Sequence, residues 1–322
     1  MIDTSERALF AETVAKVFER TPDGTDHDVD GDLAAVGWHD ALAAWGGPAI
    51  GIVLGAQGRA GATSGAIDDV VGSALGLEAS QAVILPRLGA HEPPATAGAR
   101  VVVDGTATAR VLRAERAAVV VRGPDGLRVH HLRTDRLTVE PIRGLDPDAH
   151  LCTVTAEVPH EDLDGGSDAD WSYATALGRL ALASELVGVG RAMLDLAVEH
   201  ATSRVQFGRT IGSFQAVRHR LAEAFVALEG ASAAAEACGD ATPLRPSEAA
   251  MTKALAGTAA RTAARHAQQV LAGIGFTAEH PFHRSFRRTL LLDRILGSSR
   301  SLVHEVGEIT LATRRVPMDL PL

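Results

Sequence analysis

The segment SRVQFGRTIGSFQAVRHRLAE at 203–223 combines an arginine, two phenylalanines, glycines and an amide at spacings that suit a phosphate-containing ligand. A guanidinium forms paired hydrogen bonds with phosphate, a glycine lets a ligand approach the backbone, and an aromatic ring can cover a planar group. The same spacing is also typical of an ordinary bundle helix with a surface arginine. The residues near one stripe of such a helix, which Gly208 or Gly212 could interrupt, are Arg204, Phe207, Gly208, Ile211 and Gln215.

A second segment, HAQQVLAGIGFTAEHPFHRSFRRTLLLDRILGSS at 266–299, favours the ligand-binding interpretation. Together the two segments resemble the C-terminal domain of the acyl-CoA dehydrogenase family. The family pattern Arg-x-x-Phe-Gly, followed by Phe-Gln or His-Gln, is matched by Arg204, Phe207, Gly208, Phe214 and Gln215. The pattern Gln-x-x-Gly-Gly-x-Gly-Phe is matched from Gln269 to Phe276, with Ala272 in place of the first glycine.

This resemblance implies FAD as the cofactor and an acyl-CoA thioester as the substrate. In the family these residues hold the pyrophosphate and adenosine end of an FAD that lies mainly in the neighbouring subunit. The resemblance therefore implies an FAD shared with a partner subunit and facing this segment across an interface. The residues that would bind it are Arg204, Phe207, Gln215, Gln269 and Gly273.

The family's catalytic base is a glutamate, and this chain lacks it at both family positions. The stretch that matches Tyr-Glu-Gly-Thr is Ile295-Leu296-Gly297-Ser298, with leucine at the base position. Other members place the glutamate directly before an arginine that matches Arg179, where this chain has Gly178. Neither leucine nor glycine can accept a proton, so we expect no catalytic residue. The alternative is a self-sufficient flavoenzyme with a relocated base, for which Glu185 and Asp293 are the candidates.

The contacts that the family makes with the flavin ring are also missing. LPRLGAHEP at 85–93 replaces the family's Thr-Glu-Pro-Gly-x-Gly-Ser-Asp loop, and no tryptophan lies between Trp45 and Trp171. The nearest counterpart of the family's Trp-Ile-Thr strand is around Arg110–Leu112. This combination resembles the degenerate subunit of actinobacterial α2β2 acyl-CoA dehydrogenases of the steroid-catabolism type. It implies a homologous partner subunit that carries the base; a non-catalytic scaffold is the remaining alternative.

The order of predicted elements is that of an α+β protein. We expect an N-terminal helical domain at 1–78, a small antiparallel β domain at 79–162 and a C-terminal helical bundle at 163–322. Glycine-rich or polar stretches predict loops at Thr21–Asp32 and Gly55–Gly65. The apolar spacing predicts bundle helices near 171–205, 211–238, 245–272, 281–292 and 299–314. Short Val- and Leu-rich runs predict strands, among them Ala82–Leu85, Arg100–Val103, Ala107–Leu112 and Ala117–Arg122.

Composition narrows the possible partners. The 322 residues carry 31 basic and 40 acidic side chains, a net charge of −9, which argues against nucleic acid or an anionic membrane. We see no apolar run near the ~20 residues of a membrane span and expect a cytoplasmic protein. DHDVDGDLAAVG at 26–37 begins like an EF-hand loop but has Gly37 where a bidentate glutamate belongs. We therefore predict no metal site.

Overall fold

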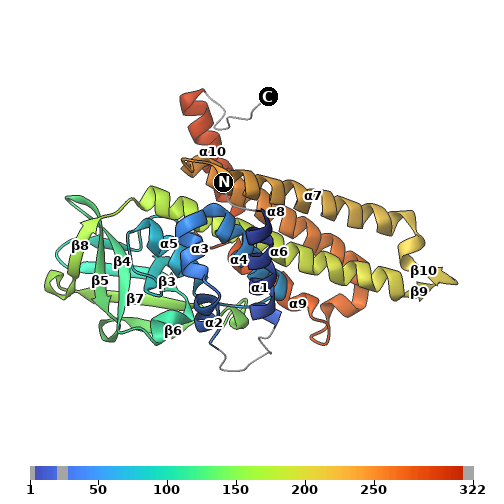
Figure 1. The fold of residues 1–322 in the computed structure, drawn as a ribbon, viewed down its shortest axis with the longest axis horizontal. Coiled ribbons are helices and arrows are strands. Elements are labelled where there is room, and N and C mark those ends of the chain that lie inside the picture. The colour runs from blue at the N-terminus through green and yellow to red at the C-terminus, as the bar shows by residue number, and fades with distance from the viewer. Residues whose placement is uncertain (1–3, 20–27, 315–322) are drawn as a thin grey trace.

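The computed structural model describes residues 4–19 and 28–314. Three groups of elements follow one another along the chain: helices, a sheet, and a bundle of long helices (Figure 1). The sheet lies at one end of the molecule and the long helices run away from it (Figure 1). This is the α+β architecture expected from the sequence; the domain boundaries stay a prediction. None of the described helices is both long and apolar enough to cross a membrane.

Five helices form the N-terminal group. Asp28 begins the second of them by accepting a hydrogen bond from the Gly31 N–H at 3.1 Å. Two predicted loops are wrong in part. Of Thr21–Asp32, residues 21–27 lie outside the described residues and residues 29–32 lie in a helix. Of Gly55–Gly65, residues 55–60 lie in a helix and residues 61–65 form the predicted loop. The helices are α1 (Thr4–Glu19), α2 (Val29–Ala35), α3 (Trp38–Trp45), α4 (Gly47–Ala60) and α5 (Ala66–Ala74).

The glycines of α4 serve close helix packing rather than a loop. A Cβ on Gly58 would collide with the backbone carbonyl of Glu185, and a Cβ on Gly188 would collide with that of Gly55. Glu185 and Gly188 belong to the long helix α6 (Trp171–Ser203), whereas Gly55 and Gly58 belong to α4. Because glycine has no side chain, the two backbones can approach directly. Packing of α4 against α6 therefore outweighs the low helix propensity of glycine.

The sheet has the strand order β6-β7-β3-β1-β4-β5-β8, and β2 pairs with both β3 and β4. It is mixed rather than purely antiparallel, because β1 and β2 each run parallel to β4. β8 pairs with β5 and extends the sheet to Asp168, past the predicted boundary. The strands are β1 (Ala82–Pro86), β2 (Ala95–Ala97), β3 (Val101–Ala107), β4 (Arg116–Gly123), β5 (Gly126–Arg133), β6 (Thr138–Pro141), β7 (Cys152–Val158) and β8 (Asp164–Asp168).

The strand predicted at Ala107–Leu112 is wrong after its first residue. Ala107 ends β3, and Ala109–Leu112 forms a 3₁₀ helix, η1. The Thr108 hydroxyl begins η1 by accepting a hydrogen bond from the Arg110 N–H at 3.3 Å. A threonine side chain that bonds to the backbone two residues on competes with strand pairing.

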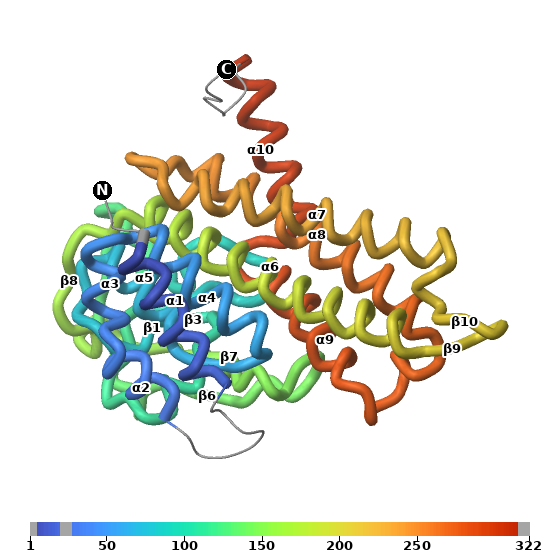
Figure 2. The backbone as a smooth tube through the Cα atoms, turned by 45° about the vertical axis from the view of Figure 1, so that its right-hand side comes forward, coloured from blue at the N-terminus to red at the C-terminus, as the bar shows by residue number. Residues whose placement is uncertain are grey.

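The C-terminal bundle confirms the predicted helices within a few residues. Its members are α6, α7 (Gln215–Asp240), α8 (Pro246–Leu271), α9 (Phe282–Leu292) and α10 (Ser299–Thr313). Most side chains of α6 between 174 and 190 are buried, so this helix forms the centre of the fold. The tube view shows α6, α7 and α8 side by side, while α10 projects from the body (Figure 2). Alanine and glycine allow this close approach; a Cβ on Gly190, for example, would lie 3.5 Å from the Ala260 Cα.

Candidate functional site

The segment at 203–215 is not a continuous helix. After α6 the chain forms a hairpin of β9 (Val205–Gln206) and β10 (Arg209–Thr210) before α7 begins. Its turn consists of Phe207 and Gly208, both left-handed, with φ of 53° and 75°. The single helical stripe considered from the sequence is therefore wrong. The hairpin instead presents Phe207, which is 92% exposed, at the far tip of the molecule.

Antiparallel packing brings the two motif segments to the same end of the bundle. Arg220 of α7 lies against His266 of α8, with 3.5 Å between Nη1 and Nδ1. Five residues before Arg220 is Gln215, and five residues after His266 is Leu271, so the start of α7 lies level with the end of α8. On the other side, Ile211 donates its N–H to the Arg204 carbonyl at 2.8 Å, which ties the hairpin to the end of α6.

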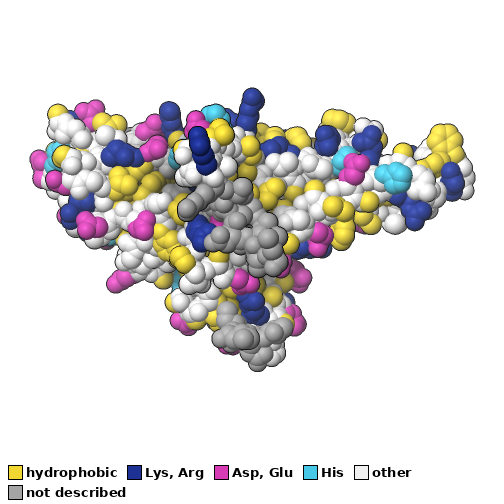
Figure 3. Space-filling model, turned by 90° about the horizontal axis from the view of Figure 1, so that it is seen from above, with side chains coloured by type: hydrophobic (Ala, Val, Ile, Leu, Met, Phe, Trp, Pro, Cys, Tyr) yellow, Lys and Arg dark blue, Asp and Glu magenta, His cyan; other side chains and the backbone are white. Residues whose placement is uncertain are grey.

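Several polar groups at this end of the bundle are exposed and lack hydrogen-bond partners among the described residues. All five residues predicted to bind FAD are exposed. Within residues 4–19 and 28–314, the Arg204 guanidinium has no hydrogen bond or ion pair, and no side chain caps the first turn of α7. A Cβ on Gly273 would meet no atom within 4 Å. Viewed from above, the tip around β9 and β10 carries hydrophobic, basic and histidine side chains (Figure 3).

These residues fit the pyrophosphate end of FAD. An unpaired guanidinium attracts an anion, and so does the positive end of a 26-residue helix such as α7. Phe207 packs edge-to-face on Phe214, with ring centroids 6.3 Å apart, and Arg209 lies 4.1 Å above the Phe214 ring. The arrangement therefore offers an anion site with an aromatic surface beside it. Gln215 and Gln269 would add amide donors and acceptors at the same end.

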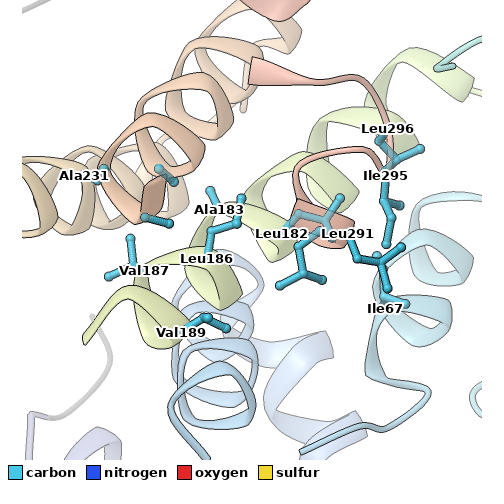
Figure 4. Packing of buried hydrophobic residues seen from close by; sticks show 14 of the residues in the cluster. Ile67, Leu182, Ala183, Leu186, Val187, Val189, Ala231, Leu291, Ile295 and Leu296 are labelled. Carbon is cyan, nitrogen blue, oxygen red and sulfur yellow. The ribbon is translucent and has the colours of Figure 1, made fainter. Parts of the chain in front are cut away.

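Gly178 and Leu296, the two positions that the sequence analysis matched to the family's glutamate, lie side by side. A Cβ on Gly178 would be 2.5 Å from the Leu296 Cδ1 and 3.1 Å from the Val71 Cγ2. Leu296 is completely buried; Figure 4 shows it next to Ile295, in the same apolar cluster as Leu291 and Ile67. The leucine side chain thus fills the space beside Gly178, and neither position supplies a carboxylate.

Two buried cations hold the loop that carries Leu296. Arg179 donates from Nε to the Leu296 carbonyl at 3.2 Å. Its Nη1 and Nη2 donate to the Glu305 carboxylate at 3.0 and 2.9 Å. Lys253 donates from Nζ to the carbonyls of Asp293, at 3.1 Å, and of Gly297. Burial lowers the pKa of Lys253 to about 7. The sequence analysis did not single out Lys253, although Lys16 is the chain's one other lysine.

The two candidates for a relocated base are engaged elsewhere. Asp293 accepts hydrogen bonds from the Ser299 N–H and hydroxyl, and its other oxygen lies 2.9 Å from Arg261 Nη1. Glu185 is buried, and Arg288 Nη1 lies 3.7 Å from its Oε1. Burial raises the pKa of Glu185, and the charge of Arg288 opposes that effect. Glu185 is seven residues from Gly178 on α6, which is roughly 10 Å along the helix axis.

The region that replaces the family's flavin-ring contacts is bound to other parts of this chain. In the 85–93 segment, Gly89 donates its N–H to the Arg294 carbonyl at 2.7 Å, and the His91 carbonyl accepts from Trp171 Nε1 at 2.9 Å. Arg110 forms ion pairs with Asp30 and Asp69. Asp30, part of the acidic stretch that begins like an EF-hand loop, is thereby paired. Among the described residues, no group of three or more His, Cys, Asp or Glu is arranged to hold a metal ion.

Comparison with known proteins matches the C-terminal part of the chain to a known domain. Residues 171–310 match the model of the acyl-CoA dehydrogenase C-terminal domain. Two similar curated proteins come from Mycobacterium tuberculosis (strain ATCC 25618 / H37Rv). Acyl-CoA dehydrogenase IpdE2 is 35% identical over 175 residues, which cover 54% of this chain and 52% of IpdE2. Acyl-CoA dehydrogenase FadE34 is 37% identical over 196 residues, which cover 58% of this chain and 27% of FadE34. The match therefore spans about half of IpdE2 and about a quarter of FadE34.

Solved structures share the fold across nearly the whole chain. The Tcur3481–Tcur3483 steroid ACAD G363A variant has a TM-score of 0.80 at 21% identity, with 96% of this chain and 99% of that chain covered. The ChsE4–ChsE5 complex from Mycobacterium tuberculosis has a TM-score of 0.78 at 20% identity, with 100% and 99% covered. Residues 171–310 therefore match the C-terminal domain of the acyl-CoA dehydrogenases, and the chain as a whole shares its fold with solved structures of that kind.

Proposed function

We propose that this chain is the non-base subunit of a cytoplasmic heteromeric acyl-CoA dehydrogenase. In this proposal it completes the FAD site of a homologous subunit that carries the catalytic glutamate. The substrate class is an acyl-CoA thioester, which the complex desaturates between the α and β carbons. We extend the proposal to steroid-derived thioesters because a structure with a TM-score of 0.80 is described as a steroid ACAD.

The observation that carries the proposal is the filled space beside Gly178. Removal of an α-proton needs a carboxylate next to the thioester, and here Leu296 occupies the place where the two family positions meet. Glu185 and Asp293 make structural contacts instead. The base would therefore come from another chain, and the two similar heteromeric structures give a precedent for such a pair.

The exposed bundle end supports the cofactor part of the proposal. Bound FAD supplies the acceptor for the hydride that leaves the β carbon. In this chain Arg204 would neutralise the pyrophosphate, the first N–H groups of α7 would donate to it, and Gln215 and Gln269 would orient the adenosine end. A structure of Mycobacterium smegmatis glutaryl-CoA dehydrogenase in complex with FADH2 has the same fold, with a TM-score of 0.74 at 16% identity.

The first experiment measures flavin per chain, by visible absorbance and protein quantitation. It uses the chain alone and the complex co-expressed with a homologous subunit that has an intact glutamate. We expect no flavin on the isolated chain and, in the complex, half as many flavins as chains. A full complement of flavin on the isolated chain would favour the self-sufficient enzyme and direct attention to Glu185 and Asp293. A flavin-free complex would favour a scaffold.

Arg204→Ala tests the assignment of the anion site. We expect the FAD affinity of the complex to fall about tenfold or more, because a charge-assisted hydrogen bond contributes roughly 1.5–3 kcal/mol. Arg133→Ala is the matched control, since that exposed arginine at the end of β5 pairs with Asp135 at 2.6 Å, in the sheet rather than in the bundle. Equal flavin retention by the two variants would overturn the assignment.

A further inference from the structure

A buried charged cluster joins the N-terminal helices to the sheet, away from the bundle end that carries Arg204 and Gln215. Its centre is Arg110 of η1, whose side chain is 9% exposed. Arg110 donates to Asp69 of α5 at 2.6 and 3.2 Å, and to Asp30 of α2 at 3.2 and 3.1 Å. A fifth hydrogen bond reaches the Gln81 carbonyl at 3.4 Å. These five bonds use the full set of N–H donors of a guanidinium.

Asp68 lies in the same cluster but receives none of these donors. The Arg110 Nε lies 4.0 Å from its Oδ2, beyond hydrogen-bond distance. Asp68 is 1% exposed. Its Oδ2 accepts a hydrogen bond from the Thr108 hydroxyl. Its Oδ1 is buried without a hydrogen-bond partner among the described residues.

The adjacent Asp69 has the opposite environment. Besides Arg110, it accepts hydrogen bonds from Trp38 Nε1 at 3.0 Å and from the Ser80 N–H at 2.9 Å. Burial alone would raise the pKa of Asp69, but the hydrogen bond and charge of Arg110 lower it overall. Two neighbouring aspartates on one helix thus meet the same arginine, and only one of them is fully paired.

The cluster carries a formal excess of two negative charges, which a proton on Asp68 would reduce to one. Three carboxylates surround a single guanidinium, and His39 of α3 lies 3.4 Å from the Asp69 Oδ2. An unpaired carboxylate in a buried site is strongly disfavoured and takes up a proton instead. Burial raises the pKa of Asp68 to about 7; Arg110 and Thr108 oppose this shift, while Asp69 and Asp30 add to it.

We infer that Asp68 is a buried proton-binding site whose protonation stabilises the junction between the N-terminal helices and the sheet. This inference does not depend on the proposed function. The charged and titratable groups that surround the site are Arg110 on η1, Asp69 on α5 and Asp30 on α2, with His39 of α3 against Asp69.

The direction of the pH dependence follows from linkage. Because the pKa of Asp68 is higher in the folded chain, about 7, than its ordinary value of 3.8, the folded state binds the proton more tightly. The stabilisation is complete below the ordinary value and is lost as the pH rises towards 7. Within that window this one group lowers the folding equilibrium constant by up to about tenfold per pH unit.

The test compares Asp68→Asn with Asp69→Asn in the full chain, by denaturant unfolding at about pH 5 and about pH 8. An amide at 68 keeps the acceptor for Thr108 without the charge. We expect D68N to be at least as stable as the natural chain at the higher pH and to lose this advantage at the lower pH. We expect D69N to be less stable at the higher pH, because Arg110 loses its closest partner. Equal destabilisation by both variants at the higher pH, or a D68N difference that does not change with pH, would overturn the inference.

Infrared spectroscopy gives an independent readout that does not require the variants to fold. The natural chain should show the C=O stretch of a protonated carboxylic acid at weakly acidic pH, and the band should disappear as the pH rises past neutrality. If D68N folds, its band should be weaker than that of the natural chain by the contribution of one carboxyl group, while D69N retains the full band; Glu185, whose pKa burial also raises, contributes equally to all three chains. Absence of the band from the natural chain at weakly acidic pH would show that Asp68 is ionised and would contradict the inference.

Discussion

Leu296→Glu places a carboxyl group back at the family's base position, and the structure predicts that it will not create an enzyme. The Leu296 side chain is completely buried and lies against the space beside Gly178. Val71 and other apolar side chains surround it. The nearest cations, Arg179 and Lys253, already donate to backbone carbonyls of the same loop. A glutamate here would therefore enter an apolar core without a ready partner.

The expected loss of stability has two parts. Removing a fully buried leucine loses about 2–3 kcal/mol of hydrophobic transfer free energy. A buried carboxyl group without a hydrogen-bond partner adds roughly 1–3 kcal/mol, even when it is protonated. Together these give about 3–6 kcal/mol, a large share of the 5–15 kcal/mol that is typical of folded domains. The loss should grow as the pH rises, because the folded state disfavours the ionised form.

The assay is denaturant unfolding of Leu296→Glu beside Leu296→Met, followed by dye-linked dehydrogenase activity with an acyl-CoA. Methionine has a similar volume and should cost less than about 1.5 kcal/mol. We expect the glutamate variant to be inactive when isolated. If it unfolds at the same denaturant concentration as the methionine variant, or turns over substrate alone, the space beside Gly178 is a hydrated pocket and the reasoning fails.

Two further predictions concern buried cations. In Lys253→Met two loop carbonyls lose their hydrogen-bond donor. Because burial lowers the pKa of Lys253 to about 7, the natural chain gains stability between about pH 7 and the ordinary lysine pKa of 10.5, and the variant should lose this gain. Denaturant unfolding at neutral and alkaline pH measures the effect, and an unchanged slope of stability against pH would contradict it. Arg288→Met removes the guanidinium that lies 2.5 Å from Asp146 and 3.7 Å from Glu185 and should cost about 3–5 kcal/mol in urea unfolding. Arg288→Lys should recover little of that loss, because one ammonium cannot reach the four acceptors that the guanidinium contacts.

Apolar spacing along the sequence was sufficient to predict the long helices of the bundle. The predicted bundle helices agree with α6 to α10 within a few residues, because apolar spacing over many turns is a strong signal. The loop predicted at Gly55–Gly65 was wrong for residues 55–60, because the glycines of α4 are explained by packing against α6 rather than by their sequence neighbours. The sequence analysis also missed the hairpin that follows α6, in which two successive left-handed residues, Phe207 and Gly208, form the turn.

The sequence by itself determined the family resemblance, the residues that we propose to bind FAD and the absence of glutamate at two positions, because these depend on residue type and spacing. Tertiary structure alone decided that Gly178 and Leu296 share one space, since residues more than a hundred positions apart meet only through helix packing. It also decided the difference between Asp68 and Asp69. Their sequence context is nearly identical, and only the direction of one arginine's donors, fixed by the fold, leaves one paired and the other to hold a proton.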